Sequence, residues 1–82
     1  MPADTDVVDF YATAEGAWVL EYGGGVRTLR GPFYGSYFTL PASARNDPGR
    51  RFWSIGPPTD TITRGYAIVS ANGEAYNFHT PS

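Results

Sequence analysis

Few residues in this 82-residue chain have the types and spacing that catalysis or metal binding requires. Ser36 stands in Tyr-Gly-Ser-Tyr, which lacks the second glycine of a nucleophile elbow, and a serine nucleophile needs an activating base within hydrogen-bond reach. The only histidine is His79, close to the C-terminus, and the chain has no cysteine. Zinc therefore lacks a plausible ligand set. We predict a protein with no enzymatic activity, cofactor or metal.

The acidic and glycine clusters also have simpler interpretations than ligand binding. Asp4, Asp6 and Asp9 lack the ligand pattern and the central glycine of an EF-hand loop, so a solvated acidic arm explains them better. The run Gly23–Gly25 precedes a predicted strand rather than a helix, which argues against a phosphate cradle. Turn formation explains the aspartates of the predicted loops.

Aromatic side chains are the group that the chain has in excess, at 16% of residues. Tyrosine and tryptophan are enriched at protein interfaces, and stacked rings also bind sugars. Core packing is the competing interpretation, for Trp18 and Trp53 in particular. A locally basic segment near residues 45–51 adds charge. The candidate interface or binding residues are Trp18, Tyr34, Tyr37, Trp53, Tyr66, Tyr76, Arg45, Arg50 and Arg51.

Composition limits the partners. A net charge of −2 with 17% charged residues argues against nucleic acid, which requires clustered cations. All six cations are arginine, which has GC-rich codons, and this indicates a high-GC genome such as that of an actinobacterium or one of its phages. The N-terminus lacks the basic and apolar regions of a signal peptide, and no apolar run reaches membrane-spanning length. We expect the protein in the cytoplasm or in a virion, without contact with a membrane.

Short aromatic and β-branched runs, separated by glycine and proline, predict an all-β domain of about seven short antiparallel strands. Residues 1–6 are expected to be a flexible acidic arm, and 7–82 a single β domain. Asn72-Gly73 predicts a type I′ hairpin turn. A β-meander, partial propeller blades and a small barrel all fit this order. The expected strands are 7–13, 17–22, 26–30, 33–40, 52–55, 66–71 and 74–79.

A weak internal repeat relates residues 16–32 to 65–81 at an offset of 49, with possible units 7–40 and 52–82. The alternative is chance, because any two hairpins share glycine turns and apolar flanks. The stretch 65–73 followed by Phe78, and Pro32-Phe-Tyr-Gly-Ser, resemble the two halves of a propeller-like repeat found in actinobacterial proteins. This resemblance implies β-meander blades and a binding or scaffold role.

The repeat also predicts how the chain finds a partner. The first unit would have four strands and the second three, which leaves an open edge as a template for another chain. A domain this small often needs a partner subunit for stability. We therefore predict a structural or interaction protein that assembles with itself or a larger particle, such as a minor structural or decoration subunit of a phage virion. The acidic arm would dock on a neighbour's arginines. The alternative is a carbohydrate-binding module that uses surface aromatics.

Overall fold

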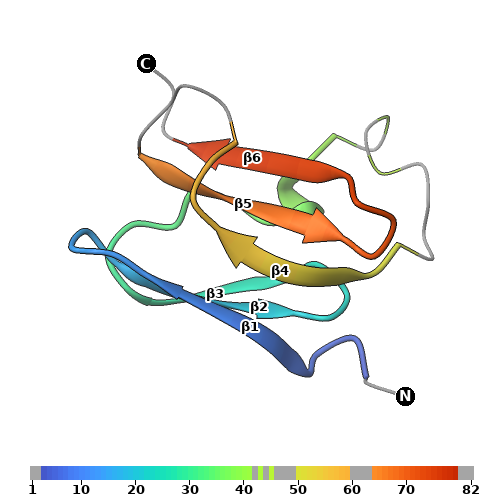
Figure 1. Cartoon of the computed structure of the whole chain (residues 1–82), viewed down its shortest axis with the longest axis horizontal. Helices are drawn as coiled ribbons and strands as arrows, with labels where there is room; N and C mark the ends of the chain where they lie inside the picture. The colour runs from blue at the N-terminus through green and yellow to red at the C-terminus, as the bar shows by residue number, and fades with distance from the viewer. Residues whose placement is uncertain (1–2, 42, 44, 46–49, 60–63, 80–82) are drawn as a thin grey trace.

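The computed structural model describes residues 3–41, 43, 45, 50–59 and 64–79, without the side chain of His79. Within these residues, six strands form two antiparallel sheets of three (Figure 1). The prediction of an all-β fold is confirmed, and six of the expected strands are present with ends within one residue of those predicted. The first sheet contains β1 (Val7–Ala12), β2 (Ala17–Glu21) and β3 (Val26–Arg30), and the second contains β4 (Phe52–Gly56), β5 (Gly65–Ser70) and β6 (Ala75–His79).

The two sheets stack face to face around one apolar core, with β1 running beside β4 (Figure 1). Of the three arrangements that fit the sequence, the small barrel is not formed, because in the described chain β1, β3, β4 and β6 each pair with a single strand. A carboxylate oxygen of Asp9 accepts a hydrogen bond from the backbone N–H of Ile55 at 2.8 Å, which links the sheets on the β1–β4 side. The buried core consists of Trp18, Leu20, Tyr37, Phe52, Ile55, Tyr66, Ile68 and Phe78.

The hairpins β2–β3 and β5–β6 have the same turn. The N–H of Gly24 donates to the carbonyl of Glu21 at 2.9 Å, and that of Gly73 donates to Ser70 at 3.0 Å. Gly24 and Gly73 have φ of 104° and 90°, whereas among the described residues only glycines have positive φ. Each turn is therefore type I followed by a glycine bulge. The predicted type I′ turn is wrong, because it requires a positive φ at Asn72 as well.

The outer strands β1 and β4 also match. Each carries one extra residue in its ladder, between Val7 and Asp9 in β1 and between Phe52 and Ser54 in β4. Such bulges re-aim side chains and bend the strand. The two sheets therefore share strand order, hairpin turn and the bulge of β1 and β4, but β3 has a further extra residue, next to Thr28, that β6 lacks. Gene duplication and kinship with the propeller-like repeat stay predictions.

Residues 33–40 do not form the expected strand. Gly35 has φ of 133°, and Ser36 caps a short 3₁₀ helix, η1 (Tyr37–Thr39), by accepting from the N–H of Phe38. Thr39 returns the bond by accepting from the N–H of Ser36 at 3.0 Å. These local hydrogen bonds compete with strand pairing. Within the described residues both units therefore have three strands, and the predicted fourth strand of the first unit is wrong.

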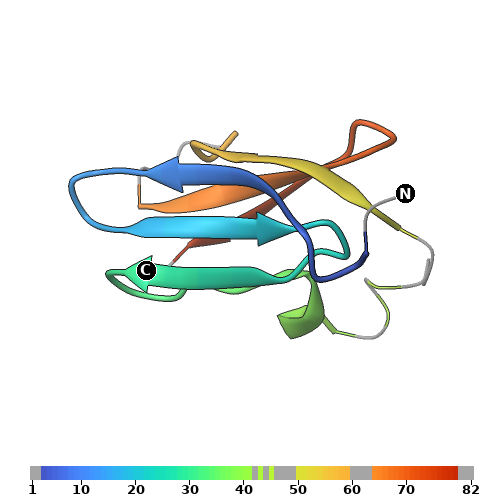
Figure 2. The same cartoon turned by 90° about the horizontal axis from the view of Figure 1, so that it is seen from below.

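Two aromatic tips hold this segment in place. The indole N–H of Trp18 donates to the carbonyl of Pro32 at 2.8 Å. The hydroxyl of Tyr66 accepts from the N–H of Gly35 at 3.0 Å and donates to its carbonyl. Residues 33–40 thereby fill the side of the sandwich opposite the β1–β4 side (Figure 2).

The N-terminal residues pack on the first sheet. The N–H groups of Gly23 and Tyr22 donate to the carbonyls of Asp4 and Asp6, each at 2.9 Å. Residues 4 and 6 thus bond to the β2–β3 turn in this structure, and the flexibility of the segment 1–6 stays a prediction. In the part of the chain that the structure describes, no helix has the length and apolar character needed to cross a membrane.

Candidate functional site

The outer face of the first sheet is the face turned away from the core. Because Trp18 and Leu20 of β2 point into the core, Val19 between them points outward. Phe10 of β1 and Arg27 of β3 pair with Val19 and lie on the same face. No described helix or strand lies in front of these three strands (Figure 2).

This outer face is apolar and exposed. Val7, Phe10 and Leu29 have exposed fractions of 57%, 54% and 61%. An ion pair between Glu21 and Arg27, at 2.8 Å, adds the polar element of the face. Monomeric soluble proteins rarely leave large contiguous apolar patches in water, and such patches mark interaction sites. The arrangement suits a partner that excludes water from the first sheet.

The outer face of the second sheet differs, because the chain itself covers part of it. Asn77 of β6 pairs with Ala67, so the two side chains share this face. The amide of Asn77 accepts from the N–H of Thr59 at 2.8 Å and donates to its hydroxyl at 2.9 Å. Ala67 is 2% exposed. This face is therefore partly covered and polar.

Three of the predicted interface residues are buried. Trp18, Tyr37 and Tyr66 belong to the core and are at most 5% exposed, so none of them offers a broad contact surface; Trp18 only lines part of the small cleft described below. The polar tips of Trp18 and Tyr66 are satisfied by backbone groups of Pro32 and Gly35. A large ring with a bonded tip suits the centre of a small core. Burial raises the pKa of Tyr66 to about 12.

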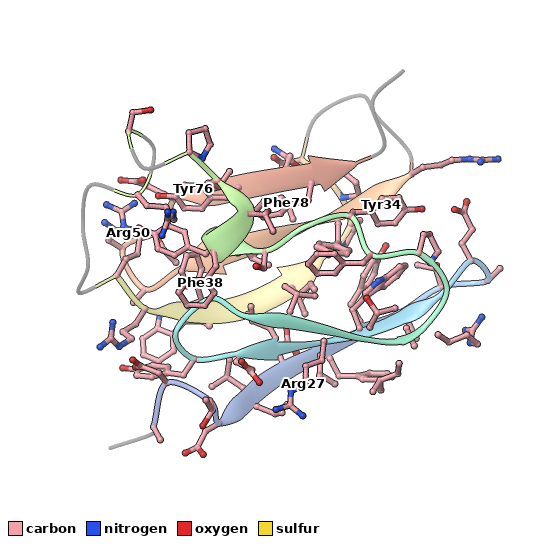
Figure 3. The ribbon with its side chains drawn as sticks, turned by 180° about the vertical axis from the view of Figure 1, so that it is seen from behind. Arg27, Tyr34, Phe38, Arg50, Tyr76 and Phe78 are labelled. Carbon is pink, nitrogen blue, oxygen red and sulfur yellow. The ribbon has the colours of Figure 1, made fainter. Side chains whose placement is uncertain are left out.

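Arg50 and Tyr76 form a cluster with Glu74 at one end of the molecule (Figure 3). The guanidinium of Arg50 bonds both the carboxylate of Glu74 and the hydroxyl of Tyr76. That hydroxyl donates to Glu74 at 2.9 Å. Burial, followed by the hydrogen bond to Glu74, raises the pKa of Tyr76. Arg45 donates to the carbonyl of Leu40 at 3.0 Å, so these predicted residues contact their own chain.

Arg51 pairs with the acidic N-terminal segment of its own chain. Its Nε lies 3.0 Å from a carboxylate oxygen of Asp4, and its guanidinium lies 5.8 Å from the ring centre of Tyr22. Asp4 and Arg51 therefore pair within one chain here, and docking of the acidic segment on a neighbour's arginines stays a prediction. Trp53, whose ring centre is 6.1 Å from that of Tyr22, is 56% exposed. It is the predicted aromatic that the structure leaves most accessible.

A small cleft lies where the β1–β2 turn meets the start of β5. Its volume is about 130 Å³. The ring of Trp18 lies 6.0 Å from that of Tyr11 and 5.7 Å from that of Tyr34. A carboxylate oxygen of Glu15 accepts from the hydroxyl of Tyr34 at 3.3 Å. The cleft is lined by Tyr11, Thr13, Ala14, Glu15, Trp18, Tyr34 and Gly65.

Electrostatics at the cleft are set by one carboxylate. Among the described lining residues, only Glu15 is charged. Burial, and then the negative charge of Glu15, raise the pKa of Tyr34. The Nε of Arg64 lies 3.8 Å from the other oxygen of Glu15, and this arginine side chain is 72% exposed. The cleft therefore presents aromatic rings and a negative charge.

Comparisons with protein-family models, curated proteins and solved structures found no match for this chain. Among the described residues, no group of three or more histidine, cysteine or acidic side chains is placed to hold a metal ion. His79 ends β6, and its side chain lies outside the description, as do the predicted loop aspartates Asp47 and Asp60.

Sequence reasoning missed the exposed face and the charge of the cleft. In the sequence, Val7, Phe10 and Leu29 look like ordinary strand residues. A signal existed, because β1 carries apolar residues on both faces, as expected of a strand that is covered twice. Among the described residues, no helix or strand covers its outer face. Glu15 stands in a turn, and nothing in the local sequence indicates the rings beside it.

Proposed function

We propose that this protein is a non-catalytic structural or interaction protein that assembles through the outer face of the first sheet. The observation that carries the proposal is the exposure of Val7, Phe10 and Leu29 on a face that no described element covers. Burial of apolar surface is the main favourable term in protein association. A small domain gains stability from such a contact as well.

The partner we favour is a second copy of the chain, related by a two-fold axis. Only one of the two outer faces is bare and apolar, since Thr59 is anchored over the other. A chain with one adhesive face closes a pair, whereas two different adhesive faces would produce a ring or an open stack. The ion pair Glu21–Arg27 lies on this face and sets the register of the contact.

Attachment to a larger assembly is the broader form of the same proposal. A minor structural or decoration subunit of a phage virion would use the same face against a particle surface. The composition supports attachment to a virion, since the chain has no cysteine, all its basic residues are arginine and its net charge is only −2. Copies that dimerise at high concentration would then replace the contact with a second copy by a contact with the particle.

Native mass in solution tests the proposal, with two matched variants. Phe10 and Phe38 are exposed to nearly the same degree, at 54% and 58%, but only Phe10 lies on the outer face of the first sheet. Light scattering coupled to size exclusion should give a pair of chains for the wild type and for Phe38→Ser. Phe10→Ser should elute as a single chain with an unchanged circular dichroism spectrum.

Two results would contradict the proposal. One is a wild-type single chain across the micromolar to millimolar range. The other is an oligomer that Phe10→Ser leaves intact, which would place the contact elsewhere. A second substitution on the same face, Leu29→Ser, checks that the effect belongs to the face rather than to one residue.

A carbohydrate-binding role is the second candidate, and Trp53 favours it. The exposed indole lies beside Tyr22, with the polar pair Arg51 and Asp4 next to it. Flat rings with neighbouring hydrogen-bonding groups are suited to sugars. Titration with mono- and oligosaccharides should change the fluorescence of Trp53. An unchanged spectrum, together with no glycan-array signal above that of Trp53→Ala, would exclude this candidate.

A further inference from the structure

Three separate regions of the chain converge on the aromatic cleft: the β1–β2 hairpin, the segment before η1 and the start of β5. Tyr11 comes from β1, Glu15 from the β1–β2 turn, Trp18 from β2 and Tyr34 from the segment that precedes η1. Gly65 contributes backbone at the start of β5. Figure 3 shows Tyr34 at the opposite end of the molecule from Arg50 and Tyr76. The cleft is therefore built by the tertiary fold and is separate from the arginine cluster.

Its size restricts the ligand to a compact group. The cleft has a volume of about 130 Å³. Pockets for drug-sized ligands start at roughly 300 Å³. A guanidinium or methylated ammonium group is small enough to enter this space.

Its chemistry selects a positive charge. The faces of Tyr and Trp rings carry negative charge and attract cations, most strongly for Trp. The carboxylate of Glu15 adds a formal charge and accepts hydrogen bonds only. A cation of this chain, Arg64, already approaches Glu15. At 3.8 Å and with 72% of its side chain exposed, that pair is weak, and Arg64 does not line the cleft.

We propose that this cleft binds a compact organic cation, an alkylammonium or guanidinium group, against the rings of Tyr11 and Tyr34 and the carboxylate of Glu15, with the buried ring of Trp18 as part of the wall. Arg64 acts as a weak internal competitor for the same carboxylate. The site is independent of the outer face of the first sheet and gives the protein a ligand as well as a partner.

Tryptophan fluorescence tests the site. Trp53→Phe leaves Trp18 as the single tryptophan, and Trp18 lines the cleft. Tetramethylammonium chloride and methylguanidinium chloride are titrated separately, against sodium chloride at equal ionic strength. A saturable change with either cation, absent with sodium, is expected. Amide shifts of Ala14 and Gly65 in the wild-type protein provide a second readout that needs no substitution.

Two variants assign the binding to this cleft. Glu15→Gln keeps the shape of the side chain and removes its charge, so binding should weaken about fivefold, as a loss of about 1 kcal/mol implies. Arg64→Gln removes the competitor, so binding should strengthen about two- to fivefold. The ammonium and guanidinium arms identify which head group the cleft prefers.

Equal responses to sodium and to both organic cations would overturn the proposal, as would affinity that Glu15→Gln leaves unchanged. Cation binding in the cleft and assembly through the first sheet can be disproved independently of each other. Glu15→Gln should keep the wild-type native mass, and Phe10→Ser should keep the wild-type affinity for the cation.

Discussion

The two sheets have the same backbone plan but bury opposite faces. At the offset of 49 residues that matches their hairpins, Trp18 and Leu20 of β2 correspond to Ala67 and Val69 of β5. The first two residues form the core, whereas β5 directs Ile68 to it instead. Side chains alternate along a strand, so a shift of one residue exchanges the faces. The ladder therefore does not decide which face is buried; the positions of the large side chains do.

This difference determines which surfaces remain. If both sheets buried the same face, they would be related by a two-fold axis and would leave equivalent outer faces. Here the two sheets bury opposite faces. The outer face of the first sheet therefore carries Phe10 and Val19, and that of the second carries Asn77 and Val69. The second is partly covered by Thr59. Because the sheets bury opposite faces, only the outer face of the first sheet is both apolar and uncovered by the described residues.

The largest effect should separate the two turn glycines. A Cβ at Gly24 would lie 2.6 Å from the Cβ of Tyr37 and 2.8 Å from a ring carbon of Phe52, whereas a Cβ at Gly73 meets nothing within 4 Å. Gly24→Ala combines strain with overpacking and should reduce the free energy of unfolding by about 2–5 kcal/mol. Gly73→Ala should cost only about 1–2 kcal/mol, from strain alone. Urea denaturation of both variants measures this, and equal costs would show that the turns are equivalent in packing too.

The next effect concerns the tyrosine that the second sheet places in the core. Tyr66→Phe leaves the N–H and carbonyl of Gly35 without their partner, and each such loss costs about 1–3 kcal/mol. We expect the free energy of unfolding to fall by about 2–4 kcal/mol. Tyr11→Phe, in the first sheet, should change it by less than about 0.5 kcal/mol. A loss at Tyr11 as large as that at Tyr66 would refute the assignment.

Alkaline pH should weaken the same contact without a substitution. The pKa of Tyr66 is about 12 in the folded protein, against 10.0 as its ordinary value. Between these values the unfolded chain releases the proton and the folded chain keeps it, so stability falls as pH rises, by up to about 1.4 kcal/mol per pH unit. Below pH 10 the contribution is complete. Denaturation from pH 8 to 12 should show a steeper loss for the wild type than for Tyr66→Phe, and parallel curves would contradict it.

The smallest effect on stability concerns Asp9 and Ser54, which follow the bulges of β1 and β4. Asp9 in β1 accepts from the N–H of Ile55, whereas Ser54 holds the matching place in β4 on the outer face. Asp9→Ala should destabilise the fold by about 1–2 kcal/mol, since it removes a partly buried charged acceptor. Ser54→Ala should stay within about 0.5 kcal/mol of the wild type. Thermal denaturation suffices, and equal shifts would mean that Asp9 does not join the sheets.

Strand positions were predictable because their signals are local. Alternating apolar residues and the glycines of the turns depend on near neighbours only, so β3 was predicted to the residue and the others to within one. The segment 33–40 failed for the opposite reason. Its aromatic residues look like a strand, but its polar groups bond to Tyr66 and to its own Ser36, and Trp18 bonds the carbonyl of Pro32 just before it. Those partners are distant in sequence or depend on a cap.

By itself, the sequence determined an all-β chain, its hairpins and the absence of cysteine chemistry. Tertiary structure alone decided which aromatics are buried, because Trp18 and Trp53 occupy similar local patterns but only Trp18 meets a second sheet. It also decided where Glu15 and Tyr34 meet. Both β2 and β5 carry apolar residues on both faces, so period-two alternation allows either face to turn inward. The choice rests on the volumes that pack across the core, and these exist only once the sheets meet.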